Sequence, residues 1–313
     1  MSSEIEQRLN EIPVIRTLVR LLNLVKLPGF KGLSLYHLLE IYTVGIVKGT
    51  FSSRASSIAY SFFVALFPFL LFILNLIPVI RIANFQNQFL GLIRRLLPPQ
   101  TQDFFLPVLE DIALNPRNNL LSVTFFLTLF LAANGVNSIF SAFEYSVHVT
   151  INRNFFRQYF VAILVSIFLA LLLLITVGSI VYGQFLINEL KMNAYIENDF
   201  FWVNALQYII FVVMLYIAIA TLYHFGVKEG RETRFFSVGA LVTTLLFLLT
   251  TYLFGVYIDN FSQYNELYGS IGALLIMMFY IWLNSNLLLL GFELNISLQR
   301  LKERSSPENI LGP

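Results

Sequence analysis

Six stretches of this chain contain no Asp, Glu, Lys or Arg, and each is at least 21 residues long. They are 57–80, 119–143, 159–182, 202–223, 235–257 and 270–290. An α-helix needs about 20 mainly apolar residues to cross a bilayer core, so every stretch is long enough to span. Only helices or closed barrels satisfy their backbone in lipid, and these stretches lack the alternation of barrel strands. The sequence therefore predicts an all-α polytopic membrane protein with six transmembrane helices.

The composition agrees with this class. The chain is 57% hydrophobic and 12% charged, and its mean hydropathy is +0.74. Soluble domains carry about 25% charged residues, roughly twice this fraction. The first apolar stretch begins near residue 57, too late for a cleaved secretory signal. The absence of Cys excludes disulfides, thiolate metal sites and Cys nucleophiles.

The distribution of basic residues predicts the orientation. In total, 15 Lys and Arg lie in the segments before the first stretch and after the second, fourth and sixth stretches. The segments on the opposite side carry only 5. The positive-inside rule therefore places both termini in the cytoplasm.

The remaining segments form no second domain. Residues 1–56 are expected to form cytoplasmic or interfacial amphipathic helices, residues 57–299 the transmembrane domain, and residues 300–313 a cytoplasmic tail. The long outer loop, 81–118, has helical apolar spacing interrupted by Pro98 and Pro99. Two short helices are expected there, either lying on the outer leaflet or packing as a lid over the bundle.

The chain carries no recognisable motif of a soluble enzyme. It has no phosphate-binding loop, zinc signature or nucleophile elbow, and its three histidines are scattered. We therefore expect no catalytic residues, no metal and no cofactor. The net charge of +2 gives no indication of a nucleic-acid partner.

Polar side chains within the spans are the candidates for function. On the sixth span Asn284 and Asn295 share one face, while Asn286 and Glu293 share another about 200° away. A helix that is polar on two faces should not show either to lipid, so this span is predicted to be central. The second and fifth spans add further candidates to the same path, Asn134, Asn137, Glu144 and Thr244.

Each of these features has a structural and a functional interpretation. Glu293 either pairs with an arginine such as Arg54 or Arg157 near the headgroups, or forms a proton or substrate site. The asparagines either join helices through hydrogen bonds worth about 0.6–2 kcal/mol, or line a path. Pro68 either kinks the first span or breaks it into a discontinuous helix beside a substrate site.

Several motifs follow one another along the chain in a specific order. They are 54–68, which contains Tyr60 and Pro68; 132–145 with 153–157; 223–226; 264–272, which contains Tyr268; and 290–295. In these segments the chain resembles the YihY/BrkB family of bacterial inner-membrane proteins, over about residues 32–302. It departs from the family at Phe143 and Glu144, where members often carry a Leu-Asn type pair, and at His224, where an Arg is usual.

The resemblance implies six spans with both ends cytoplasmic, in the bacterial inner membrane. The family has carried a ribonuclease label, which the residues of this chain do not support, and has been linked to virulence and to envelope lipid transport. It supplies no accepted catalytic residues, so Tyr60, Pro68 and Tyr268 enter only as further candidates for the path.

Two classes of function remain. The first is a translocator of a lipid, an amphipathic solute or an ion through a polar path between the second, fifth and sixth spans. The second is an envelope scaffold, whose partners would be other envelope proteins. In both cases membrane lipids surround the protein.

Overall fold

The computed structural model describes residues 50–76, 118–145, 154–192, 200–232, 234–260 and 270–304. Within these ranges the chain forms six α-helices and one short 3₁₀ helix, with no strand. The elements are α4 (Thr50–Leu76), α7 (Asn118–Glu144), α8 (Phe155–Met192), α9 (Phe200–Gly226), η2 (Glu229–Glu232), α10 (Val238–Asn260) and α12 (Ser270–Arg304). The all-α prediction is confirmed.

Five of these helices have the length and apolar composition of membrane spans. Within the described residues the spans are Ser122–Glu144, Phe155–Thr176, Ala205–Gly226, Val238–Ile258 and Leu274–Gln299. The helix α4, which carries the first predicted span, has 27 residues. At a rise of 1.5 Å per residue it is about 40 Å long, enough to cross a bilayer core. The chain is a polytopic membrane protein.

Three of the sequence predictions lie outside the described residues. These are the amphipathic helices before residue 50, the outer-loop helices within 81–117, and any role of Tyr268.

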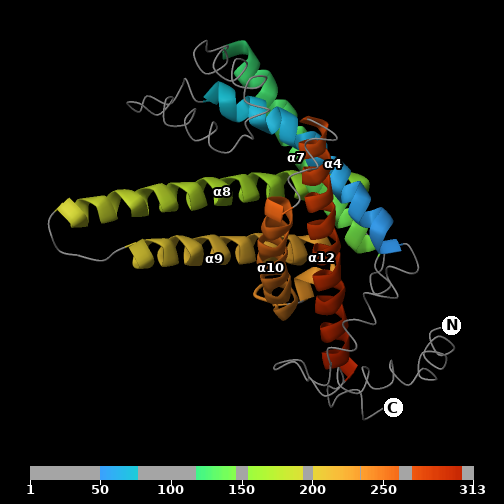
Figure 1. Ribbon diagram of the computed structural model, residues 1–313. Coiled ribbons are helices and arrows are strands. Elements are labelled where there is room, and N and C mark those ends of the chain that lie inside the picture. The colour runs from blue at the N-terminus through green and yellow to red at the C-terminus, as the bar shows by residue number, and fades with distance from the viewer. Residues whose placement is uncertain are drawn as a thin grey trace, which may run out of the picture.

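The helices form two pairs that diverge from a shared region (Figure 1). The helix α4 packs along α7, and α8 packs along α9 as an antiparallel partner, while α7 contacts α8. The helix α12 packs on α4 and α10, and α10 also touches α9. We call the region between the α4–α7 and α8–α9 pairs the fork, and the region where all six helices meet the junction.

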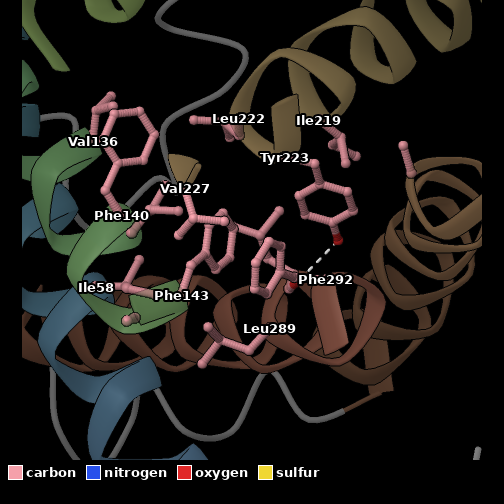
Figure 2. Packing of buried hydrophobic residues seen from close by; sticks show 14 of the residues in the cluster. Ile58, Val136, Phe140, Phe143, Ile219, Leu222, Tyr223, Val227, Leu289 and Phe292 are labelled. Atoms are coloured by element: carbon pink, nitrogen blue, oxygen red, sulfur yellow. Dashed lines mark hydrogen bonds between the residues drawn. The ribbon is translucent and has the colours of Figure 1, made fainter. Parts of the chain in front are cut away.

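The junction contains the hydrophobic core. Its buried residues come from the first parts of α4, α8 and α10 and the last parts of α7, α9 and α12. At its centre Phe143 stacks on Phe292 with ring centroids 3.9 Å apart, and Tyr223 meets both rings edge-on at 5.7 Å (Figure 2). Edge-on arrangements such as those of Tyr223 add to the gain from burial.

Two glycines allow α10 and α12 to approach closely within the junction. A Cβ on Gly239 would lie 2.6 Å from both the Cβ of Asn295 and the carbonyl oxygen of Gly291. A Cβ on Gly291 would collide with Oγ1 of Thr243 and lie 2.5 Å from the Tyr223 hydroxyl. Small residues commonly permit such close helix contacts in membranes.

The prediction that the sixth span is central agrees with the burial of α12. Every residue from Leu288 to Ile296 is buried, so this part of the helix is enclosed on all sides. Of the two interpretations of Pro68, the discontinuous helix is wrong, because α4 is a continuous helix through Pro68. Neighbouring groups can compensate for the lost backbone bond of a proline in a membrane helix.

Candidate functional site

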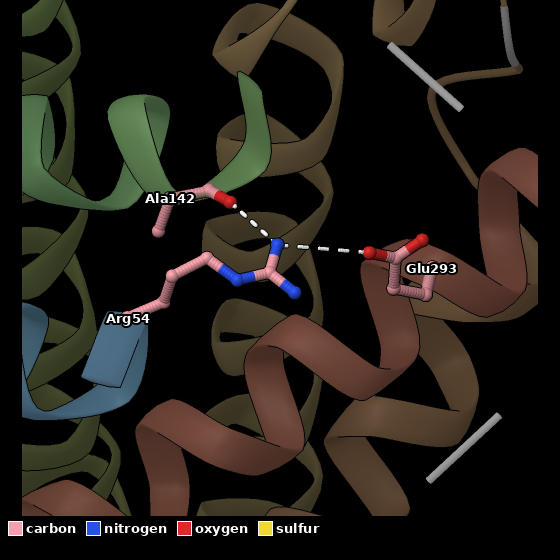
Figure 3. Close-up of polar contacts among 3 residues, drawn as sticks. All are labelled: Arg54, Ala142 and Glu293. Carbon is pink, nitrogen blue, oxygen red and sulfur yellow. Dashed lines mark hydrogen bonds and ion pairs between the residues drawn. The ribbon is translucent and has the colours of Figure 1, made fainter. Parts of the chain in front are cut away.

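A buried ion pair joins three helices at the junction. Glu293 on α12 is 5% exposed, and its Oε1 lies 3.7 Å from Nη1 of Arg54 on α4. The same nitrogen of Arg54 donates a hydrogen bond of 2.9 Å to the carbonyl oxygen of Ala142 on α7 (Figure 3). Of the two arginines that the sequence offered as partners, Arg54 therefore pairs with Glu293, while Arg157 is exposed.

A second polar contact joins α7 to α8. Gln158 is buried. In one of the two orientations of its side-chain amide, the nitrogen donates to a carboxylate oxygen of Glu144 at 3.0 Å and the oxygen accepts a 3.2 Å bond from the Ser141 hydroxyl. We assign this amide orientation because a carboxylate only accepts hydrogen bonds. Glu144 thus joins helices at the junction.

A third group of contacts joins α9, α10 and α12. The Tyr223 hydroxyl lies 2.7 Å from Oγ1 of Thr243 and donates a 2.8 Å bond to the carbonyl oxygen of Leu288. This side chain therefore ties α9 to both neighbours at the point where the two glycines bring them together.

The asparagines of α12 bond mainly to their own helix. Asn284 donates to the carbonyl oxygen of Tyr280 at 2.9 Å, and Asn286 donates to that of Trp282 at 2.8 Å. Each acceptor lies four residues earlier, as does the acceptor of Thr244, the carbonyl oxygen of Ala240. For Asn284 and Asn286, the hydrogen bonds seen among the described residues are therefore within α12 rather than between helices.

Some polar atoms in this region are buried without a hydrogen-bond partner among the described residues. They are Oδ1 of Asn137, Oδ1 of Asn284 and Nδ2 of Asn295. Buried polar atoms are usually paired, so such exceptions call for a specific reason, including a bound molecule or water.

A cavity of about 480 Å³ lies in the fork. This volume falls within the range of about 300–1,000 Å³ that is typical of small-molecule sites. Among the described residues, its lining carries no charged residue and three polar ones, Thr128, Ser166 and Thr176. The wall comes from four helices, α4, α7, α8 and α9, with Phe62, Ala65, Leu66, Phe69, Phe72, Phe125, Leu129, Ala132, Val136, Leu169, Ala170, Leu172, Leu173, Phe211, Met214, Leu215 and Ala218 as the other lining residues.

None of the candidate residues that the structure describes lines this cavity. Glu293, Asn295, Asn286 and Thr244 are buried in α10 and α12, and Tyr60 is 62% exposed on α4. The helix α12 lies chiefly against α4 and α10, and it meets α7 through the stacked rings of Phe143 and Phe292. The path between the second, fifth and sixth spans therefore stays a prediction. The cavity was missed because no motif marks its Leu, Phe and Ala lining.

The described residues include no group of three or more His, Asp or Glu close enough to hold a metal ion. The chemistry available in this part of the chain is therefore that of a buried ion pair, several hydroxyls and amides, and an apolar cavity.

These features define a polytopic all-α membrane protein with a packed junction and an apolar cavity. The chain belongs to the family described as virulence factor BrkB, whose match covers residues 45–310. This match confirms the resemblance that the ordered motifs indicated.

Individual relatives agree with this assignment. The chain is 27% identical to the putative ribonuclease-like protein YfkH of Bacillus subtilis over 254 residues, which cover 80% of this chain and 91% of that protein. It is 25% identical to a UPF0761 membrane protein of Coxiella burnetii over 246 residues, covering 76% and 84%. A UPF0761 membrane protein of Psychrobacter is 24% identical over 284 residues, and the chain spans 50% of that relative's length. No solved structure matches the chain.

Proposed function

We propose that this chain is a translocator in the bacterial inner membrane, with both termini in the cytoplasm, and that it moves an amphipathic molecule. The observation that carries the proposal is the cavity in the fork, which ends at the packed junction. A binding chamber that is closed at one end is what alternating access requires in one of its states.

The junction supplies a closure that can be opened. Its helices are joined by a small number of polar contacts, chief among them Arg54 with Glu293 and Tyr223 with Thr243. Polar contacts between membrane helices contribute about 0.6–1.7 kcal/mol each, so a closure of this kind can exchange with an open state. Asn137, Asn284 and Asn295, whose buried atoms lack partners, would then meet cargo or water in the open state.

We propose no catalytic role. The name of YfkH describes that protein as ribonuclease-like, but the described residues of this chain offer no cluster of His and acidic side chains for such chemistry. The apolar lining of the cavity also fits a polynucleotide poorly, because its described residues present no cation to phosphate groups.

Translocation is tested in vesicles that contain the purified full chain and a headgroup-labelled fluorescent phosphatidylglycerol. An impermeant reductant added outside bleaches only the outer leaflet, so protein-mediated movement should carry bleaching well beyond half of the signal. The matched variant is Ala132→Trp, which fills the cavity, and its control is the exposed Leu249→Trp on α10. Equal and background-level bleaching in all three folded proteins would sink the proposal for this cargo.

A scaffold is the second candidate, and exposed aromatic side chains near the junction favour it. Phe156 is 85% exposed at the start of α8, and Phe155 and Phe236 are exposed as well. Such residues suit either the membrane interface or a protein partner.

The two candidates predict different solvent access for the same side chains. Because the chain has no Cys, single cysteines report access without interference from native thiols. Labelling of mid-membrane positions by an impermeant thiol reagent supports a solvated path, whereas labelling of position 293 alone, from the cytoplasm alone, favours the scaffold. The positions to compare are Asn137, Thr244, Asn284, Asn286 and Glu293.

A further inference from the structure

We propose that the cavity in the fork receives one alkyl chain of the cargo, end first, and that the residues at its junction end select the length of that chain. The inference rests on the proposed translocation for the role of the bound molecule. The binding itself stands on the geometry of the cavity.

The length of the cavity fits a lipid chain. Its lining runs from Phe62 to Phe72 on α4 and from Ser166 to Thr176 on α8. At 1.5 Å per residue each wall extends about 15 Å. This is about half of the roughly 30 Å hydrocarbon core, and therefore the depth of one leaflet.

The cavity has a defined floor. Val136 is buried, belongs to the junction core and also lines the cavity, and Phe62, Leu169 and Leu215 pack against the same core. Ala218 lies on α9 next to Ile219, another core residue. The end of a bound chain would therefore meet Val136 and Ala218, beyond which the packed core allows no further penetration.

The opposite end of the cavity is aromatic. Phe72 on α4 and Phe125 on α7 lie with ring centroids 5.5 Å apart, and Phe211 on α9 lines the same end. A chain could enter the cavity from the side, between α4 and α9. These two helices pack mainly on other partners, because α4 packs on α7 and α12 whereas α9 packs on α8 and α10.

One hydroxyl in the wall has no partner within the described part of the chain. Ser166 and Thr176 donate to the carbonyl oxygens of Ala162 and Leu172 on their own helix, both at 2.7 Å. The Oγ1 atom of Thr128 is buried and unpaired. Thr128 lies one turn from Phe125 and eight residues from Val136, or about 12 Å from the floor. An ester or hydroxyl group at the head of the chain could bond to it.

The chemistry of the lining selects against other cargo. In the described part of the chain, the wall has no charged side chain to pair with an ion, and its three hydroxyls are too few to replace a hydration shell. The geometry therefore points to a chain-bearing lipid rather than to a hard ion or a sugar.

The test uses the full chain in nanodiscs and a series of monoacylglycerols with a photoreactive diazirine at the chain terminus, from 8 to about 18 carbons. The parent protein should be captured at Val136 or Ala218 with one preferred chain length. Val136→Ala deepens the floor and should shift the preference to longer chains. Ala218→Leu raises it and should shift the preference to shorter ones, since a chain longer than the remaining depth can no longer fit fully into the cavity.

The controls separate this effect from general damage. Leu249→Phe changes an exposed residue of α10 and should leave the preference unchanged. Thr128→Val should weaken monoacylglycerol binding about 2- to 10-fold without moving the preferred length. Opposite shifts for the two floor variants cannot arise from partial unfolding, because unfolding would lower capture at every length.

Each outcome bears on a distinct claim. The inference is overturned if capture is absent, or if the folded parent and both floor variants show no length preference. Absent capture because another segment of the chain fills the cavity also overturns it. Length-selective capture together with no movement of labelled lipid between leaflets overturns the proposed translocation alone.

Discussion

The junction and the fork are built from the same helices, but they use their side chains in opposite ways. At the junction, aromatic rings stack at 3.9 Å, two glycines bring helix backbones into contact, and an ion pair lies largely out of solvent. In the fork the facing side chains do not meet, and a cavity of about 480 Å³ remains between them. A four-helix wall without a charged group among its described residues thus lies next to a densely packed core that holds an ion pair.

Because of this difference, the two regions should respond differently to substitution. Changes at the junction disturb packed or hydrogen-bonded groups, so they should lower the free energy of unfolding. Changes in the fork alter an existing space, so they should change what binds and leave stability nearly intact.

The largest effect is expected from Glu293→Ala. Removal of the carboxylate leaves the guanidinium of Arg54 in a buried position without its ionic partner, which should lower the free energy of unfolding by about 3–5 kcal/mol. Thermal or denaturant unfolding in detergent micelles measures this loss.

The double variant Arg54→Met with Glu293→Leu tests the cause. Replacing both charges by apolar side chains of similar size should restore most of the stability, because no charge remains buried. An equal loss in the single and double variants would show that the ion pair is not the source of the effect.

Gly291→Ala should have the next largest effect. The added Cβ collides with Thr243 and crowds the Tyr223 hydroxyl, and overpacking of this kind costs about 1–3 kcal/mol. Gly255→Ala on the neighbouring helix is the matched control, because nothing lies within 4 Å of its added Cβ. That control should be neutral or should stabilise α10 by up to about 1 kcal/mol in an unfolding measurement.

The extent to which the sequence predicts these regions depends on how much each relies on polar groups. Charge-free stretches predict the membrane-spanning class because a charge in lipid is costly. The two polar faces of the sixth span predict its central position. One of the two interpretations of Glu293, an interfacial carboxylate paired with Arg54 or Arg157, includes the observed partner, because a carboxylate near lipid needs a cation. Polar residues in lipid restrict their own surroundings.

The fork could not be predicted in the same way. Ala132, Val136 and Leu215 satisfy no hydrogen bond and carry no charge, so each is equally suited to a packed core, a cavity wall or a lipid-facing surface. Only the divergence of the helix pairs decides between these environments. Pro68 shows a related difficulty for prediction. Proline disrupts isolated helices, but α4 continues through Pro68, as membrane helices allow where neighbouring groups compensate.

Tyr223→Phe tests how much one hydroxyl contributes to the stability of the junction. This group bonds to Thr243 and to the Leu288 carbonyl oxygen, and its removal leaves both without that partner while the ring stays in place. The free energy of unfolding should fall by about 1–2 kcal/mol. Stability equal to that of the parent protein would mean that the aromatic packing alone holds α9 to α10 and α12.

The smallest effect on stability is expected from Thr128→Val, which removes a hydroxyl in the fork. Because Oγ1 of Thr128 is buried without a partner among the described residues, no hydrogen bond is lost and the side-chain shape is kept. The free energy of unfolding should stay within about 0.5 kcal/mol of the parent value or rise slightly. A loss as large as that of Tyr223→Phe in the same unfolding experiment would show that Thr128 has a structural partner. The fork would then be a second packed region, and the cavity would no longer distinguish it from the junction.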